Sequence, residues 1–300
     1  MSTKIVIVNY YYYVYIYLMY TKQRACFSIY ISKSLMTISL KPNTTGLIFA
    51  MREEQEGLES FIQNKQVHQI AKRRFIQGQL WGHPVVMVLA GIGKVAAAST
   101  TSLLIHHFQI NQLILSGVAG AADPALKVGD IVIARELLQH DMNASPLFPR
   151  FEIPLTGKSR FFVNKNLHLE LQKATTLFVQ NIQKYIPESL RKEWDLMKIE
   201  MYSGLVASGD QFIHEAAIVN QLKKELPDLL ALEMEGAAIA QVCDEHDLEF
   251  AILRTISDNA NETASIDFQS FVNQIAAPYT VGILKNYFEN KEQIFDTNNT

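Results

Sequence analysis

The sequence predicts an α/β fold, and two observations support this prediction. From Thr45 onward, short apolar runs alternate with amphipathic stretches long enough for helices, which is the pattern of strands and helices that pack in layers. Neither an internal repeat nor a low-complexity linker divides residues 45–290. A chain of 300 residues, 48% of them hydrophobic, can form one large α/β domain or at most two. We therefore expect residues 41–300 to form one domain.

The first half of this domain contains five predicted strands and two predicted helices. The apolar runs bounded by glycine, proline or polar residues favour strands, and the longer amphipathic runs favour helices. The predicted order is a strand at 46–51, a helix at 53–63, two strands within 74–90 around a Gly-His-Pro turn, a helix at 93–108, and strands at 112–120 and 128–138 with a loop at 119–127 between them.

The second half alternates more regularly between helix and strand. Each predicted strand here is an apolar run that ends in small or acidic residues. The predicted order is a helix at 165–182, a strand at 202–210, a helix at 215–226, a strand at 229–234, a helix at 235–246, a strand at 249–258 and a closing helix at 267–288.

The amino-terminal residues 1–40 differ in composition from the rest of the chain. Residues 5–20, IVIVNYYYYVYIYLMY, are apolar and aromatic without a helical stripe, and they are fewer than the ~20 residues that cross a bilayer as a helix. Three interpretations compete: a membrane-associated leader, an extra β-rich segment, or translated sequence upstream of a true start at Met36. We favour the third interpretation or a functionless appendage, because everything after Thr44 resembles a self-sufficient domain. This predicts a leader outside the fold and no membrane association.

Composition also argues against several classes of function. The net charge of -3 comes with no basic stripe, whereas proteins that bind nucleic acid through phosphate contacts are typically basic. The two cysteines, Cys26 and Cys243, are too few for a disulfide framework and are typical of a reducing cytoplasm. The paired His106 and His107 have no third ligand at metal spacing. We therefore predict a cytoplasmic protein without a metal.

Acidic residues follow several of the predicted strands. Glu233 and Glu235 are two residues apart, so within a strand both side chains lie on one face. Ser257 and Asp258 end another strand, and Glu54 follows the first. In open α/β sheets, ligands bind outside the carboxyl ends of the strands. Each acid taken singly is better explained as a helix cap, but the set together indicates a binding site.

Seven segments carry a resemblance to a known family. They are GLIFAMREEQEGL, LAGIGKVAAA, SGVAGAADPALKVGDIVIA, HDMNAS, SGDQFI, EMEGAAIAQVC and ILRTISDNAN. In order and spacing they resemble 5′-methylthioadenosine/S-adenosylhomocysteine nucleosidases of the purine nucleoside phosphorylase/uridine phosphorylase superfamily. The resemblance implies a three-layer α/β/α fold with a central mixed, partly barrel-like sheet, a homodimer, no cofactor, and hydrolysis of an N-glycosidic bond that releases adenine and a 5-thioribose product.

The resemblance implies specific catalytic roles. Asp258 is expected to protonate the purine at N7, with Ser257 orienting it. Glu54 is expected to position and deprotonate water, and Arg254 to organise that water and Glu54. Glu235 is expected to accept hydrogen bonds from the ribose hydroxyls and to stabilise a cationic sugar. These roles agree with the chemistry, because N-glycosidic cleavage needs a protonated leaving base, a stabilised oxocarbenium ion and a guided water molecule.

The resemblance also implies substrate-binding positions. Phe212 is expected to stack on the purine, the main chain of Ile213 to hydrogen-bond its edge, and Met234 to pack beneath the ribose. The other binding positions implied are Val118, Ala119, Gly120 and Glu233.

The sequence departs from the family pattern at three places. Val118 stands where many members have a serine, and Arg52 replaces an acid, so the assignment of the water-activating acid rests on Glu54. The stretch 145–161 is longer than in the shortest members, and its Leu147 or Phe148 could complete the alkylthio pocket of a neighbouring subunit.

We therefore predict an enzyme that hydrolyses 5′-methylthioadenosine and S-adenosylhomocysteine in methionine salvage. The alternatives are a purine nucleoside phosphorylase and a non-catalytic nucleoside-binding or membrane-tethered sensor. A phosphorylase would need a phosphate-binding site of glycine and arginine after the first strand. In the stretch GLIFAMRE, Arg52 is the only side chain that could donate hydrogen bonds to phosphate. Intact Glu54, Glu235 and Asp258 argue against the sensor.

Overall fold

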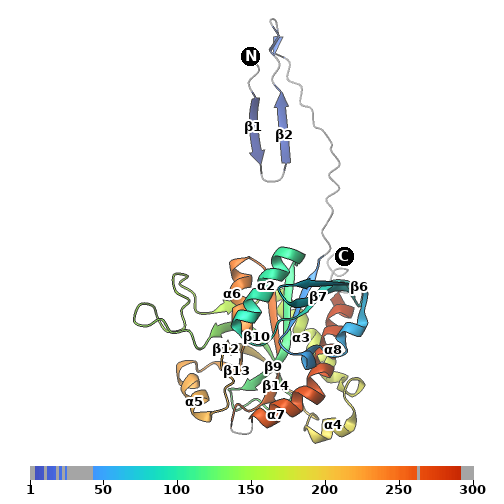
Figure 1. Ribbon diagram of the computed structural model, residues 1–300, viewed down its shortest axis with the longest axis vertical. Coiled ribbons are helices and arrows are strands. Elements are labelled where there is room, and N and C mark those ends of the chain that lie inside the picture. The colour runs from blue at the N-terminus through green and yellow to red at the C-terminus, as the bar shows by residue number, and fades with distance from the viewer. Residues whose placement is uncertain are drawn as a thin grey trace. The chain divides into compact units, whose positions relative to one another are not determined.

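The computed structural model describes residues 4–9, 12–17, 20–21, 24–25, 43–261 and 264–291, and of residues 4–25 and 265–267 only the backbone (Figure 1). The chain divides into two compact units, 1–41 and 42–300. In the first unit, strand β1 (Lys4–Asn9) pairs antiparallel with β2 (Tyr12–Tyr17), and β3 (Tyr20–Thr21) pairs with β4 (Arg24–Ala25). Met36, the expected start, lies outside the described residues. No helix in the described part of the chain is long and apolar enough to span a membrane.

The second unit is built on a mixed sheet of ten strands. Its hydrogen-bonded order is β11-β10-β12-β13-β9-β5-β8-β7-β6, with β14 pairing both β10 and β9. The strands are β5 (Thr45–Phe49), β6 (Ile62–Ile70), β7 (Arg73–Leu80), β8 (His83–Leu89), β9 (Gln112–Ala121), β10 (Ile131–Gln139), β11 (Phe161–Phe162), β12 (Met201–Ser208), β13 (Leu229–Glu233) and β14 (Glu249–Asp258).

Five of these strands close into a barrel. β10 pairs parallel with β12, and β12 pairs parallel with β13. β13 pairs antiparallel with β9, β9 pairs parallel with β14, and β14 returns antiparallel to β10. The expected mixed, partly barrel-like sheet is therefore confirmed.

Helices cover the sheet on both faces, which gives three layers (Figure 1). Alternate residues of one strand face different cores, as the period of a strand requires. Leu47 of β5 and Ile114 of β9 pack with α3 (Lys165–Gln180) and α8 (Ala277–Lys291). Ile48 and Leu115 pack with α2 (Lys94–Phe108) and α6 (Gly236–Glu245). Strands buried on both faces explain the continuous apolar runs of the sequence.

The predicted helix at 53–63 is wrong. The chain forms a one-turn helix α1 (Arg52–Gln55), a 3-10 turn at Leu58–Phe61 and then the strand β6. Gly57 lies between them with φ of 79°, a left-handed conformation that ends the helix. Most side chains of β6 are exposed, so the strand carries no apolar periodicity that would have revealed it.

The remaining helices correspond to predicted segments, with one exception. α5 (Ala216–Glu225) lies within the predicted range. The closing helix consists of α7 (Ala264–Phe271), a π-helical segment (Val272–Ala276) and α8. The short α4 (Glu188–Glu193) was not predicted; it follows Pro187 and buries no side chain.

Candidate active site

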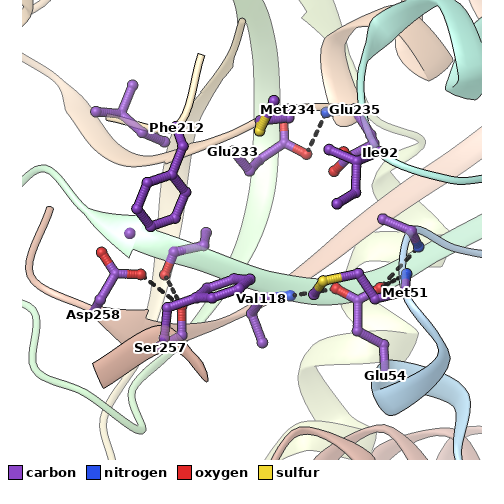
Figure 2. Close-up of a pocket in the computed structure, with 15 residues that line it drawn as sticks. Met51, Glu54, Ile92, Val118, Phe212, Glu233, Met234, Glu235, Ser257 and Asp258 are labelled. Carbon is purple, nitrogen blue, oxygen red and sulfur yellow. Dashed lines mark hydrogen bonds between the residues drawn. The ribbon is translucent and has the colours of Figure 1, made fainter. Parts of the chain in front are cut away.

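A cavity of about 320 Å³ opens where several strands of the barrel end (Figure 2). Its lining comes from the ends of β5, β9, β13 and β14, from the loop after β8, from Phe212 after β12, and from α7. The lining residues are Ala50, Met51, Glu54, Ile92, Val118, Ala119, Gly120, Phe212, Leu232, Glu233, Met234, Glu235, Ser257, Asp258 and Phe268. The expected placement of acids at the carboxyl ends of strands is confirmed, as ligand sites of α/β sheets require.

A fully buried arginine lies behind one wall of this cavity. Arg254 of β14 donates from Nη2 to Glu233 Oε2 and, at 3.2 Å, to Glu235 Oε2. Burial alone lowers the pKa of Arg254, but the charges of Glu233, Glu235 and Glu54 outweigh it and raise the pKa. Arg254 is therefore a permanent cation that compensates a buried group of acids.

Glu235 lies at the junction of β13 and α6. It is the residue before the first helical residue, and its Oε1 accepts a hydrogen bond from Gly93 N at 2.9 Å. Burial and the neighbouring charge of Glu233 raise its pKa to about 7, although Arg254 opposes the shift. Glu54, Glu233 and Asp258 line the same cavity as Glu235, and its lining contains no lysine, arginine or histidine.

Glu233 has a structural role at the same junction. Its carboxylate accepts hydrogen bonds from the backbone of Glu235 and Gly236, at the start of α6. Ser208 Oγ, at the end of β12, donates to Glu233 and accepts from Ala237 N. These bonds satisfy the first N–H groups of the helix and fix the carboxylate that holds Arg254.

Glu54 is held deep in the cavity from the opposite side. Its Oε2 accepts hydrogen bonds from Ala50 N at 2.8 Å and Met51 N at 2.9 Å, and its Oε1 accepts from Val118 N at 3.2 Å. Burial raises the pKa of Glu54, partly offset by the Arg254 charge and these N–H donors. A carboxyl group with a raised pKa takes a proton from water more readily than an ordinary one.

Gly117 explains how Glu54 and Arg254 come close together. A Cβ atom at this position of β9 would overlap both Arg254 Nη1 and Glu54 Oε1. Within the described residues, Nη1 and Nε of Arg254 have no hydrogen-bond acceptor. A guanidinium with free donors therefore lies beside a carboxyl group of raised pKa.

Asp258 and Ser257 end β14 at the other side of the cavity. Ser257 Oγ donates to Asp258 Oδ2 at 2.8 Å (Figure 2). Ala260 N donates to Asp258 Oδ1 at 2.9 Å. Both residues are buried. These bonds fix the orientation of the Asp258 carboxyl group toward the cavity.

Apolar side chains complete the lining. Phe212 is 41% exposed, and its ring packs edge-on against Phe268 with 5.4 Å between centroids. Ile92, Met51 and Met234 contribute further apolar surface (Figure 2). An accessible aromatic ring near a fixed carboxyl group suits a flat heteroaromatic ligand.

The comparisons with known proteins agree with this geometry. A sequence model of the Phosphorylase superfamily matches residues 44–289. The 5′-methylthioadenosine/S-adenosylhomocysteine nucleosidase of Anoxybacillus flavithermus is 33% identical over 230 residues, which cover 77% of this chain and 91% of that protein. The chain belongs to this nucleosidase family of the phosphorylase superfamily.

Solved structures of the nucleosidase family match the fold as well. The Neisseria meningitidis nucleosidase in complex with methylthio-immucillin-A has a TM-score of 0.72 and 30% identity, covering 83% of this chain and 99% of that one. The Colwellia psychrerythraea nucleosidase in complex with adenine has the same TM-score and identity, covering 83% and 96%.

Most of the positions that the nucleosidase resemblance implied lie together in the cavity. Two do not line it: Arg254 lies behind the wall, and Ile213 is buried against Ala122 and neighbouring apolar residues. Sequence reasoning missed five lining residues, namely Ala50, Met51, Ile92, Leu232 and Phe268. Ala50 and Met51 directly follow a predicted strand and could have been found; Phe268, on the closing helix, gave no such signal.

Proposed function

We propose that this chain hydrolyses the N-glycosidic bond of 5′-methylthioadenosine and S-adenosylhomocysteine, releasing adenine and a 5-thioribose product. The observation that carries the proposal is the pair of fixed acids, Glu54 and Asp258, on different sides of one cavity. One acid is available on each side of a bound nucleoside, as cleavage of a glycosidic bond by water requires.

In this mechanism Asp258 gives a proton to N7 of the leaving adenine. As the bond between C1′ and N9 breaks, its electron pair goes to the purine, and protonation at N7 keeps the leaving base neutral. Ser257 holds the carboxyl group in place. Phe212, backed by Phe268, stacks on the purine, and the main chain of Ile213 hydrogen-bonds its edge.

Glu54 takes the proton from the attacking water. The water lies against the Glu54 carboxyl group. Nη1 of Arg254, buried and unpaired within the described residues, lies behind that group, and the arginine charge organises Glu54 and thereby the water. Its oxygen forms the new bond to C1′, and one proton passes to Glu54. The raised pKa of Glu54 supports its role as a base.

Glu235 stabilises the sugar while its charge is positive. Its carboxylate accepts hydrogen bonds from the ribose hydroxyls, and the negative charge opposes the oxocarbenium charge in a site shielded from water. Met234 packs beneath the ribose. Glu233 holds Arg254 rather than the substrate, so we assign it a positioning role.

We further propose a cytoplasmic homodimer. Leu147 is 83% exposed, an apolar side chain that a second subunit would cover. We propose that Leu147 or Phe148 completes the alkylthio pocket of the partner.

The test is the sugar product. The purified protein is incubated with 5′-methylthioadenosine, with and without phosphate, and the sugar is identified by mass spectrometry. Release of 5-methylthioribose is expected to be independent of phosphate. Arg52, the side chain that could donate hydrogen bonds to a bound phosphate, lies outside the cavity lining. A sugar 1-phosphate would mean a phosphorylase, and binding without turnover would mean a sensor.

A further inference from the structure

A serine and a buried histidine face a second cavity, at the other end of β12. Ser203 is near the start of this strand and Ser208, which contacts the nucleosidase site, is its last residue. Ser203 and Ser208 are five residue steps apart, which is roughly 16 Å at the rise of a strand. The second cavity measures about 520 Å³, and none of its lining residues lines the first.

The hydrogen bonds of His168 fix its tautomer. Its Nδ1 lies 3.0 Å from the carbonyl oxygen of Ala134, and its Nε2 lies 3.0 Å from Ser203 Oγ. A carbonyl oxygen only accepts, so Nδ1 carries the hydrogen. In the neutral ring Nε2 is then an acceptor, and Ser203 donates its hydroxyl hydrogen to it.

Burial favours this neutral ring. His168 on α3 is buried, and burial lowers its pKa, partly offset by the bond to Ala134. At neutral pH the imidazole is therefore an available base. The Ala134 carbonyl orients it, which is the arrangement of nucleophile, base and orienting group found in nucleophilic catalysis.

The strands supply the reason for this placement. β10 carries a bulge between Ala134 and Glu136 in its pairing with β12. Bulges re-aim side chains and interrupt a ladder. Next to this bulge, the Ala134 carbonyl pairs with the histidine and Arg135 lies in the lining of the cavity.

The rest of the lining indicates the kind of ligand. Arg135 and Lys165 are exposed cations, the partly buried acid Glu136 is paired with Arg160 at 3.1 Å, and Phe162 and Leu169 are exposed apolar side chains, 70% and 43% accessible. Apolar surface beside positive charge suits an acyl group whose carbonyl oxygen becomes negative during attack.

We propose that Ser203 is a nucleophile activated by His168, and that this cavity is a second active site that cleaves small carboxylic esters. Ser203 Oγ bonds to the carbonyl carbon as its proton passes to His168 Nε2. The ester C–O bond then breaks, and the leaving alkoxide takes that proton. Water, deprotonated by His168, releases the carboxylic acid and restores the serine.

The experiment uses two probes on the full chain. A fluorophosphonate, which loses fluoride when serine attacks phosphorus, labels the activated hydroxyl, and mass spectrometry locates the label. p-Nitrophenyl butyrate reports ester cleavage. The variants are Ser203→Ala and His168→Gln, with Ser102→Ala as the matched control. Ser102 is also partly exposed, but its hydroxyl donates to a helix carbonyl, that of Ala98, and to no histidine in the described part of the chain.

Labelling of Ser203 is expected in the wild type and in Ser102→Ala, and at least about tenfold slower in His168→Gln, within the range that a general base contributes. Adenine release from 5′-methylthioadenosine should stay unchanged in all three variants and so shows that each is folded. Asp258→Asn should keep the label, which separates this site from the nucleosidase site.

Two results would overturn the proposal. One is a folded wild type whose Ser203 stays unlabelled, which would make the Ser203 to His168 bond purely structural. The other is equal labelling of Ser203 in wild type and His168→Gln, which would remove the histidine from the reaction. The pH dependence of labelling should also report His168. Because the pKa of His168 lies below the ordinary histidine value of 6.5, the labelling rate should stay constant down to about pH 6.5 and fall only at lower pH.

Discussion

At the scale of single residues, the nucleosidase site depends on how one arginine is shared. Arg254 pairs with Glu233 and Glu235, and its charge also reaches Glu54. Removing one partner of such a buried group leaves an uncompensated charge. Substitutions that keep size and hydrogen bonding are therefore the informative ones.

Asp258→Asn should lower kcat by roughly 10²–10⁴, the range expected for loss of a general acid. The amide keeps the shape and an acceptor for Ala260 N but has no proton to give. Steady-state adenine release measures the rate, and KM should change far less. If the carboxyl group only capped the chain, the variant would melt at a lower temperature but turn over normally.

Glu54→Gln should abolish hydrolysis while the site still binds adenine nucleosides. The adjacent Glu53→Gln is the matched control, because Glu53 lies on the same helical turn but lines a different cavity. Turnover measures the first effect and calorimetric titration with adenine the second. Full loss of activity in the Glu53 variant instead would mean that the water-activating acid has been assigned to the wrong residue.

The pH profile of kcat/KM should report Glu235. Burial and Glu233 raise the pKa of Glu235 to about 7, and the mechanism needs its anion. The anion is present above this pKa and lost as pH falls through it, so activity should drop by about tenfold per pH unit below pH 7. Rates measured from pH 5 to 9 test this. A profile that stays flat below pH 7 would contradict this prediction. The same loss of activity at acidic pH in Glu235→Gln would mean that another group causes it.

At the scale of elements, β9 is the strand on which the site is assembled. It pairs with β5, β13 and β14, which deliver Glu54, Glu233 and Asp258 to one place. β9 itself lines the cavity with Val118, Ala119 and Gly120, and Gly117, which has no side chain, leaves room for Arg254 and Glu54. Glycine within a strand often marks a place where another group approaches the backbone closely.

Gly117→Ala should lower kcat by roughly 10²-fold, because a displaced catalytic group costs about this much. The matched control is Gly46→Ala on the adjacent β5, where the new Cβ would meet the flexible end of Ile110 at 2.7 Å. That variant should lose some thermal stability but keep its rate. Comparable rates in the two variants would contradict the role given to Gly117.

At the scale of the whole molecule, residues 42–300 form a compact unit by contacts. We expect a chain that begins at Met36 to keep the full kcat/KM of the nucleosidase reaction. A chain that begins at Met51 is the control, because it lacks β5, which pairs with β8 and β9, and it should not fold. A soluble but inactive Met36 chain would show that the leader contributes to the fold.

The sequence by itself determined the alternation of strands and helices and the acids at the strand ends. Strands buried on both faces are uniformly apolar, so their runs are visible locally, and polar residues that interrupt such runs, as at Ser257 and Asp258, mark the edge of the sheet. The family motifs added the roles of these residues.

Only the tertiary structure decided how these ends meet. Closure of β14 between β9 and β10 sets Arg254 behind Glu233 and Glu235, and no local pattern specifies such pairing between distant strands. Phe268 reaches the cavity from the closing helix, and β6, most of whose side chains are exposed, forms through its pairing with β7. Ser203 and His168 also meet only through packing, since 35 positions separate them. Long-range burial and pairing, rather than local propensity, fix such contacts.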